Sequence, residues 1–185
     1  MANKNIKKSA LIIFLVFILI FAFFIRLVGL QQVELLFDEY ADFSVAITIK
    51  ENLNPFDSKY TYGIIDDFDQ TRFSYYLTAF LLFWRFDTMG SRIISIIFAT
   101  LTVLVVYFIG KELFNKETGL ISAALMAFSV YHIAFSRLAM TSGDSVFLFF
   151  YLTSGYFFYK GMKCKKNFYI FLSAIFTGIS IATKL

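Results

Sequence analysis

Acidic side chains recur in this sequence beside an aromatic residue or an arginine. Residues 37–40 (FDEY) hold two adjacent carboxylates, and residues 66–69 (DDFD) hold three more. Further along the chain, Arg137 is followed by Asp144. A carboxylate can take a proton from a hydroxyl group, and an arginine can hold a phosphate through paired hydrogen bonds. Together these groups suit the displacement of a lipid phosphate from a sugar carbon by an acceptor hydroxyl.

The composition indicates that helices in a lipid bilayer position these groups. The chain has 185 residues, which allows one domain or part of one. It is 59% hydrophobic and only 16% charged, whereas a soluble domain averages about 25% charged residues. This excludes a disordered chain, a nucleic-acid-binding domain and an ordinary water-soluble enzyme. We therefore expect an all-α polytopic membrane protein that contacts membrane lipids and has no nucleic-acid partner.

Five apolar runs come close to the roughly 20 residues that a helix needs to cross the hydrocarbon core. Aromatic or lysine side chains at their ends can lengthen them. The expected spans are residues 9–26, 93–113, 118–136, 145–160 and 167–184. Residues 27–92 form a more polar segment, in which the apolar stretch 73–84 is too short to span. We expect this segment to be an external loop that carries interfacial helices.

The lysines of the short segments predict the orientation, because cytoplasmic loops are enriched in basic residues. With a cytoplasmic N-terminus, three lysine-bearing segments face the cytoplasm: Lys4, Lys7 and Lys8; Lys111 and Lys116; and Lys160, Lys163, Lys165 and Lys166. Asp38, Glu39 and Asp144 then share the outer boundary of the membrane, although they are far apart in the chain. The expected location is the plasma membrane of a prokaryote.

Short motifs follow one another along nearly the whole chain in a characteristic order. They are RLVGL (26–30), DEYA (38–41), FDQTRFSYYL (68–77), SR (91–92), GKELF (110–114), SRLA with DS (136–139, 144–145) and GISIATK (178–184). Their order and spacing resemble the N-terminal part of a GT-C class membrane glycosyltransferase. The family is glycosyltransferase family 39, which includes protein O-mannosyltransferases and aminoarabinose (lipid A) transferases.

The resemblance implies roles for individual residues. Asp38 would be the catalytic base, and Asp144 a second carboxylate that supports catalysis or places the acceptor. Asp69 takes the position of an acidic residue that belongs to a metal site in some members. A divalent metal is therefore compatible with the resemblance, although no cofactor is required by it. The substrate-binding candidates are Glu39, Tyr40, Arg72, Arg92, Arg137 and Lys184.

The implied reaction is the transfer, with inversion, of a sugar from a polyprenyl- or dolichyl-phosphate donor. The acceptor is a hydroxyl of a protein, lipid or glycan on the outer face of the membrane. The chain departs from the family pattern at Gln70, where the family has a lysine, and at Thr71 and Arg72, where it has prolines. Arg72 could supply the missing charge. Because family members are longer, we expect residues 1–185 to be a single N-terminal transmembrane segment of a larger catalytic domain. Whether this chain is active alone stays open.

The alternative from another class is a non-catalytic membrane scaffold or a transporter subunit. A transporter is expected to place ionisable side chains in the middle of its spans. In the interiors of the expected spans, His132 is the only ionisable residue, and we expect it to pack or to make a hydrogen bond. This pattern argues against ion-coupled transport but does not separate an enzyme from a scaffold.

Overall fold

The computed structural model describes residues 2–34, 39, 77, 80, 87–138 and 144–184, and the side chains of these residues except 2–8 and 184. Every regular element in this part of the chain is a helix, which confirms the all-α prediction. The elements are α1 (Ala2–Leu27), the short 3₁₀ helix η1 (Leu30–Gln32), α5 (Thr88–Leu113), α6 (Lys116–Phe128), α7 (Val130–Ser136), α8 (Asp144–Cys164) and α9 (Asn167–Lys184). Of the expected interfacial stretch 73–84, only Leu77 and Phe80 are described, and both are helical.

Two segments are long and apolar enough to cross a membrane, Ser9–Gln32 and Thr88–Leu113. Helices α6 and α7 make a third if the bent pair is counted as one span. Among the described residues, α8 and α9 do not meet the same combined test of length and hydropathy. The molecule is therefore an integral membrane protein of the expected class, and the count of five spans stays a prediction.

The run expected as one span at 118–136 is divided in the structure. Helix α6 ends at Phe128, α7 begins at Val130, and the two axes differ by 59°. Ser129 between them has an extended backbone, and its side chain accepts a hydrogen bond from the backbone N–H of His132. Serine favours such N-cap positions over helix interiors. An uninterrupted apolar run can therefore still break here, which hydropathy alone does not reveal.

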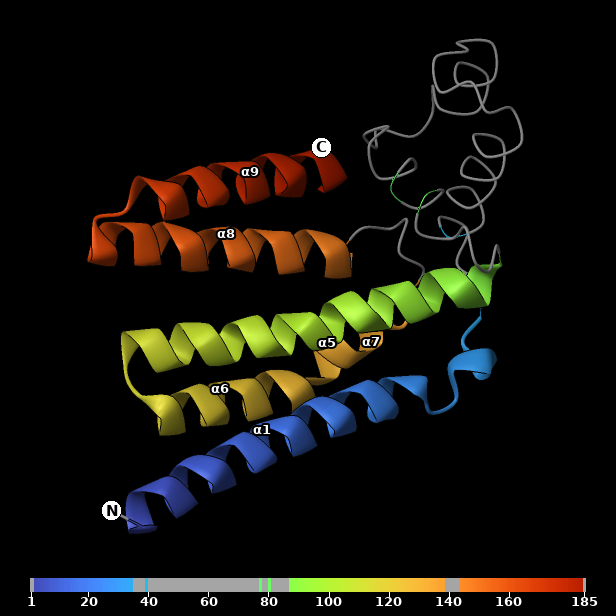
Figure 1. Cartoon of the computed structure of the whole chain (residues 1–185). Coiled ribbons are helices and arrows are strands. Elements are labelled where there is room, and N and C mark those ends of the chain that lie inside the picture. The colour runs from blue at the N-terminus through green and yellow to red at the C-terminus, as the bar shows by residue number, and fades with distance from the viewer. Residues whose placement is uncertain are drawn as a thin grey trace.

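Helix α5 lies in the middle of the bundle, with α1 and α6 on one side and the α8–α9 pair on the other (Figure 1). Helices α5 and α6 approach closely at Gly119. A Cβ atom there would lie 2.7 Å from the carbonyl oxygen of Tyr107. Gly119, Ala123 and Ala127 are all buried and recur every four residues. This spacing forms the stripe of small residues along which membrane helices pack tightly.

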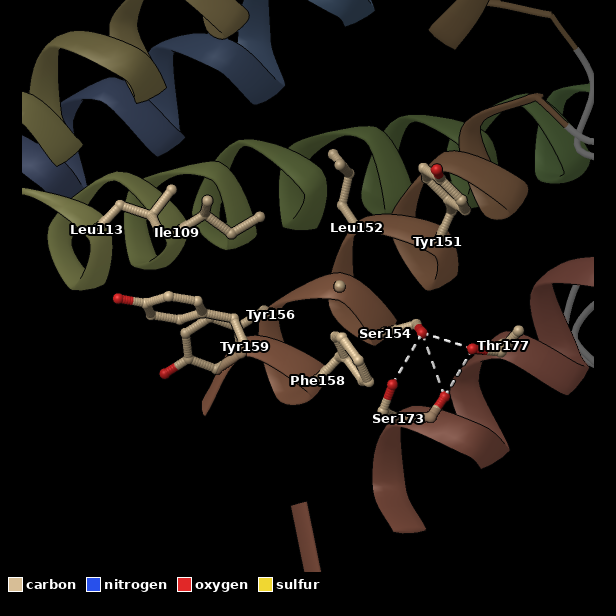
Figure 2. Close-up of a pocket in the computed structure, with 11 residues that line it drawn as sticks. Ile109, Leu113, Tyr151, Leu152, Ser154, Tyr156, Phe158, Tyr159, Ser173 and Thr177 are labelled. Carbon is tan, nitrogen blue, oxygen red and sulfur yellow. Dashed lines mark hydrogen bonds between the residues drawn. The ribbon is translucent and has the colours of Figure 1, made fainter. Parts of the chain in front are cut away.

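Helices α8 and α9 are joined by hydroxyl groups as well as by packing. Ser154 Oγ lies 2.6 Å from Thr177 Oγ1 and 3.2 Å from the carbonyl oxygen of Ser173. Figure 2 shows this cluster beside a cavity of about 450 Å³ between α5, α8 and α9. Lys163 near the end of α8 also contacts Glu112 of α5, with 3.2 Å between Nζ and Oε2. The hydrogen bond from this lysine to Glu112 raises the pKa of Lys163.

Candidate active site

The candidate residues that the structure describes lie at one end of the bundle. This is the end at which α1 ends and α5 and α8 begin (Figure 1). Ile94 near the start of α5 and Val146 near the start of α8 belong to one buried apolar cluster. Arg137, at the end of α7, donates a hydrogen bond of 2.6 Å to the carbonyl oxygen of Val28, just beyond α1. Four distant parts of the sequence therefore meet here.

Arg92 is the centre of a network that joins α5 to the segment after α1. Its Nε and Nη2 donate to the two carboxylate oxygens of Glu39, at 3.3 and 2.9 Å. Its Nη1 donates to the carbonyl oxygens of Leu30 and Val33, and its Nη2 also donates to that of Glu34. A guanidinium has five N–H donors, so all of them are used within the chain.

In this geometry Arg92 and Glu39 join two segments of the chain. Arg92 is 4% exposed and Glu39 is fully buried, and a charged pair out of water is stable only when its hydrogen bonds are complete. The planar guanidinium fork matches a carboxylate with two parallel bonds, which a lysine could not do. The five bonds therefore join Leu30, Val33, Glu34 and Glu39 to the start of α5, and every N–H of Arg92 is donated to one of these residues.

Arg137 is bound less completely than Arg92. Beyond its bond to Val28, its Nε is buried and has no hydrogen-bond partner among the described residues. Gly29, which the Arg137 side chain approaches, has a left-handed backbone with φ of 65°. Glycine adopts this conformation without a steric penalty. A glycine turn thus brings the end of α1 against the guanidinium of Arg137.

A buried pair between Arg26 and His132 was not expected. Arg26, which the sequence places at the end of the first span, is fully buried. Its Nη1 donates to the carbonyl oxygen of Ala22 at 2.5 Å, and its Nη2 lies 2.7 Å from His132 Nδ1. The pair joins residues 106 positions apart. No short motif in the sequence signals it.

Asp144 begins α8, where a negative charge is favoured by the helix dipole. It lines a cavity of about 270 Å³ between the α6–α7 bend and α8. This cavity is also lined by Ser129, Tyr131, His132, Phe135 and Phe147. The larger cavity of Figure 2 is lined by Ile109 and Leu113, at the opposite end of α5 from Arg92. None of the predicted site residues that the structure describes lines it.

The remaining predicted site residues lie outside what the structure describes. Asp38, Tyr40, Asp69 and Arg72 are among the residues not described, and of Lys184 only the helical backbone is. The proposed convergence of Asp38 and Asp69 with Asp144 is therefore untested. Within the described ranges, no three histidine, cysteine, aspartate or glutamate side chains come together as metal ligands.

Comparison with protein families gives a match over residues 72–185, to the model described as dolichyl-phosphate-mannose-protein mannosyltransferase. The matched segment is more than half of the chain and includes Arg92, Arg137 and Asp144. Comparisons with curated proteins and with solved structures give no match. The match confirms the resemblance drawn from the motifs, and with it a membrane glycosyltransferase class that uses a lipid-linked sugar donor. The chain belongs to the dolichyl-phosphate-mannose-protein mannosyltransferase family, within the GT-C glycosyltransferases.

Proposed function

We propose that this chain transfers a sugar from a polyprenyl- or dolichyl-phosphate donor to an acceptor hydroxyl at the outer face of the membrane. The acceptor oxygen attacks the anomeric carbon from the side opposite the phosphate, and its proton passes to the Asp38 carboxylate. The bond between the anomeric carbon and the phosphate oxygen breaks, and the lipid phosphate leaves as an anion. Attack from the opposite face inverts the anomeric centre.

The observation that carries this proposal is the buried ion pair between Arg92 and Glu39. Glu39 directly follows Asp38 in the chain, and the hydrogen bonds of Arg92 join Glu39, together with Leu30, Val33 and Glu34, to the start of α5. Arg137 and Asp144 lie at this same end of the bundle. A base, a second carboxylate and a cation for the leaving phosphate are the groups that this displacement needs.

The roles divide according to how each side chain is bound. Asp38 is the proposed base, a role that contributes about 10²–10⁴ in rate. Arg137, whose guanidinium donates a hydrogen bond to the carbonyl oxygen of Val28 at this end of the bundle, is the proposed phosphate contact. Asp144 places the acceptor hydroxyl, and Tyr40, Arg72 and Lys184 are proposed further substrate contacts. The family description favours a protein hydroxyl as the acceptor.

The test replaces Asp38→Asn in the chain reconstituted in liposomes. Transfer of radiolabelled mannose from dolichyl-phosphate mannose to a serine- and threonine-containing peptide is measured. We expect the variant to lose at least about 10² in rate while its helical circular dichroism and its unfolding temperature match the wild type.

The matched control is Asp87→Asn at the same end of the bundle. Asp87 caps α5 by accepting a hydrogen bond from Gly90 N at 2.6 Å, and asparagine caps a helix about as well as aspartate. This variant removes a carboxylate without touching the proposed base, so it should transfer sugar at the wild-type rate. Undiminished transfer by the Asp38→Asn chain, or no transfer by the wild type, contradicts the proposal.

A further inference from the structure

The cavity of about 450 Å³ between α5, α8 and α9 can be reached from outside the bundle. Tyr151, Gly155 and Phe158 of α8 line it, and all three are exposed. A Cβ atom at Gly155 would meet no atom of the described chain within 4 Å, so this face of α8 is hollow at the glycine. Sites for small molecules have volumes of about 300–1,000 Å³, and the cavity is therefore large enough for a ligand from the surrounding membrane.

Part of the lining is apolar, and its serine and threonine hydroxyl groups already have partners. Ile109 of α5 and Leu152 of α8 line the cavity. Ser154 Oγ lies 2.6 Å from Thr177 Oγ1, and Thr177 Oγ1 donates a hydrogen bond to the carbonyl oxygen of Ser173. An alkyl chain leaves these hydrogen bonds intact, so this part of the cavity suits an alkyl chain.

Two lysines lie beside one end of this cavity. Tyr156 and Tyr159 line it, and Figure 2 shows their hydroxyl groups pointing toward the end marked by Leu113. Lys160 Nζ donates a hydrogen bond of 3.3 Å to the Tyr156 hydroxyl. Lys163 Nζ lies 5.7 Å from the centroid of the Tyr159 ring. A tyrosine hydroxyl that accepts a hydrogen bond still has its own proton to donate, so hydroxyl and ammonium donors meet at this end.

The charge around this end of the bundle is positive. Segments 111–117 and 160–166 hold two glutamates, Glu112 and Glu117, and six lysines, Lys111, Lys116, Lys160, Lys163, Lys165 and Lys166. Glu112 pairs with Lys163, but the lysines outnumber the glutamates. Basic pockets between membrane helices attract anionic lipid head groups. Charge therefore favours an anionic lipid over a neutral one.

We propose that this cavity binds one anionic phospholipid from the leaflet at the lysine-rich end of the bundle. An acyl chain lies along α8 against Ile109 and Leu152. The phosphate accepts hydrogen bonds from the Tyr156 hydroxyl and from the ammonium groups of Lys160 and Lys163. A transmembrane helix or a second copy of the chain would fill the hollow without supplying an anion. The inference is separate from the proposed sugar transfer, because the cavity and the candidate active site lie at opposite ends of α5.

The test measures which lipids the purified chain retains. Protein in detergent micelles is mixed with palmitoyl-oleoyl-phosphatidylglycerol or with palmitoyl-oleoyl-phosphatidylcholine, and bound lipid is counted by native mass spectrometry. We expect the first phosphatidylglycerol to bind at least about tenfold more tightly than phosphatidylcholine, the value of one hydrogen bond to a charged group. Equal retention of the two lipids overturns the proposal.

Gly155→Leu tests the place of the acyl chain. The new side chain fills the hollow, and its Cβ atom meets no described atom within 4 Å, so the helices keep their packing. We expect phosphatidylglycerol to bind at least about tenfold more weakly, the value of burying two methylene groups, with an unfolding temperature no lower than that of the wild type. Undiminished retention overturns the proposal. A wild-type dimer that Gly155→Leu dissociates also overturns it, by assigning the hollow to a second copy.

Gly178→Leu is the matched control on α9. A Cβ atom at Gly178 would also meet no described atom within 4 Å, but Gly178 does not line the cavity. This variant should retain phosphatidylglycerol as the wild type does. An equal loss in both glycine variants would show that the cavity is not the binding site.

Lys160→Gln tests the place of the phosphate. The variant loses the ammonium group beside Tyr156, so its preference for phosphatidylglycerol over phosphatidylcholine should fall at least about tenfold. Lys116→Gln is the control, because it removes the same charge at the same end of the bundle but from α6, on the other side of α5 (Figure 1). The control should keep the wild-type preference. An equal loss in the two lysine variants overturns the proposal, since it would come from overall charge.

Discussion

At the residue scale, Arg92 and Arg137 are chemically identical side chains that the tertiary structure uses differently. The sequence predicts substrate binding for both. The five N–H groups of Arg92 donate hydrogen bonds to Glu39 and to three backbone carbonyl oxygens. The buried Nε of Arg137, in contrast, has no hydrogen-bond partner among the described residues. The difference comes from the number of acceptors around each guanidinium, which a local motif does not encode.

Removing Arg92 should therefore affect folding first. Arg92→Ala removes the cation that pairs with the buried Glu39 carboxylate, and breaking such a pair costs about 3–5 kcal/mol in free energy of unfolding. Arg92→Lys should fall between wild type and Arg92→Ala, because a lysine cannot reproduce the bidentate fork. Denaturant unfolding in detergent micelles, followed by circular dichroism, measures both.

Lys163→Ala is the control for this comparison, since it breaks an ion pair that is open to solvent. Exposed pairs contribute little to stability, so this variant should unfold close to wild type. If Arg92→Ala also unfolded like wild type, the ion pair between Arg92 and Glu39 would not stabilise the fold.

Arg137→Ala should affect transfer more than folding. The variant loses one hydrogen bond to Val28, which is worth about 1 kcal/mol, and the proposed contact to the lipid phosphate. We expect KM for dolichyl-phosphate mannose to rise at least about tenfold, because hydrogen bonds to charged groups are worth about 1.5–3 kcal/mol. Steady-state kinetics in liposomes measures this. A normal KM would remove Arg137 from the proposed phosphate site.

At the scale of the elements, close approach between α5 and α6 depends on Gly119. A Cβ atom there would lie 2.7 Å from the carbonyl oxygen of Tyr107 and 2.9 Å from the backbone nitrogen of Lys111. Both are backbone atoms, so no side chain can move aside. The helices themselves must separate to accept a methyl group, which loosens the packing of the small-residue stripe on α6.

Gly119→Ala should consequently destabilise the bundle, although alanine favours helix formation by about 1 kcal/mol over glycine. Gly155→Ala is the matched control, because a Cβ atom at Gly155 would meet nothing within 4 Å. The control should be as stable as wild type or slightly more so. Thermal unfolding of both variants tests this, and a stabilised Gly119→Ala protein would contradict the tight crossing.

At the scale of the whole molecule, charge separates the two ends of the bundle. The end of the bundle opposite Arg92 and Asp144 is the one where α5 and α8 end and α6 begins (Figure 1). It carries Lys111 of α5, Lys116 of α6 and Lys163 of α8. This arrangement agrees with a bundle whose lysine-rich end faces the cytoplasm, and the direction of insertion remains a prediction.

Cys164, the single cysteine and an exposed one, offers a test of the orientation. It lies in the lysine-rich turn, so a membrane-impermeant maleimide should not label it in intact cells. A Cys164→Ser chain that also carries Gln31→Cys, at an exposed position of the opposite end, should be labelled. The reverse pattern of labelling would invert the topology and place the site on the cytoplasmic side.

The sequence by itself determined the class of this protein and the family to which it belongs. Apolar runs and an ordered set of short motifs are local features, so they can be read without knowing how the chain folds. The tertiary structure decided the bend at Ser129. It also decided two polar pairs: Arg92 with Glu39, which lie 53 residues apart, and Arg26 with His132, which lie 106 residues apart. Such pairs form because helices bring distant polar groups together away from water, where each group must find a partner, and no local pattern specifies which partner that is.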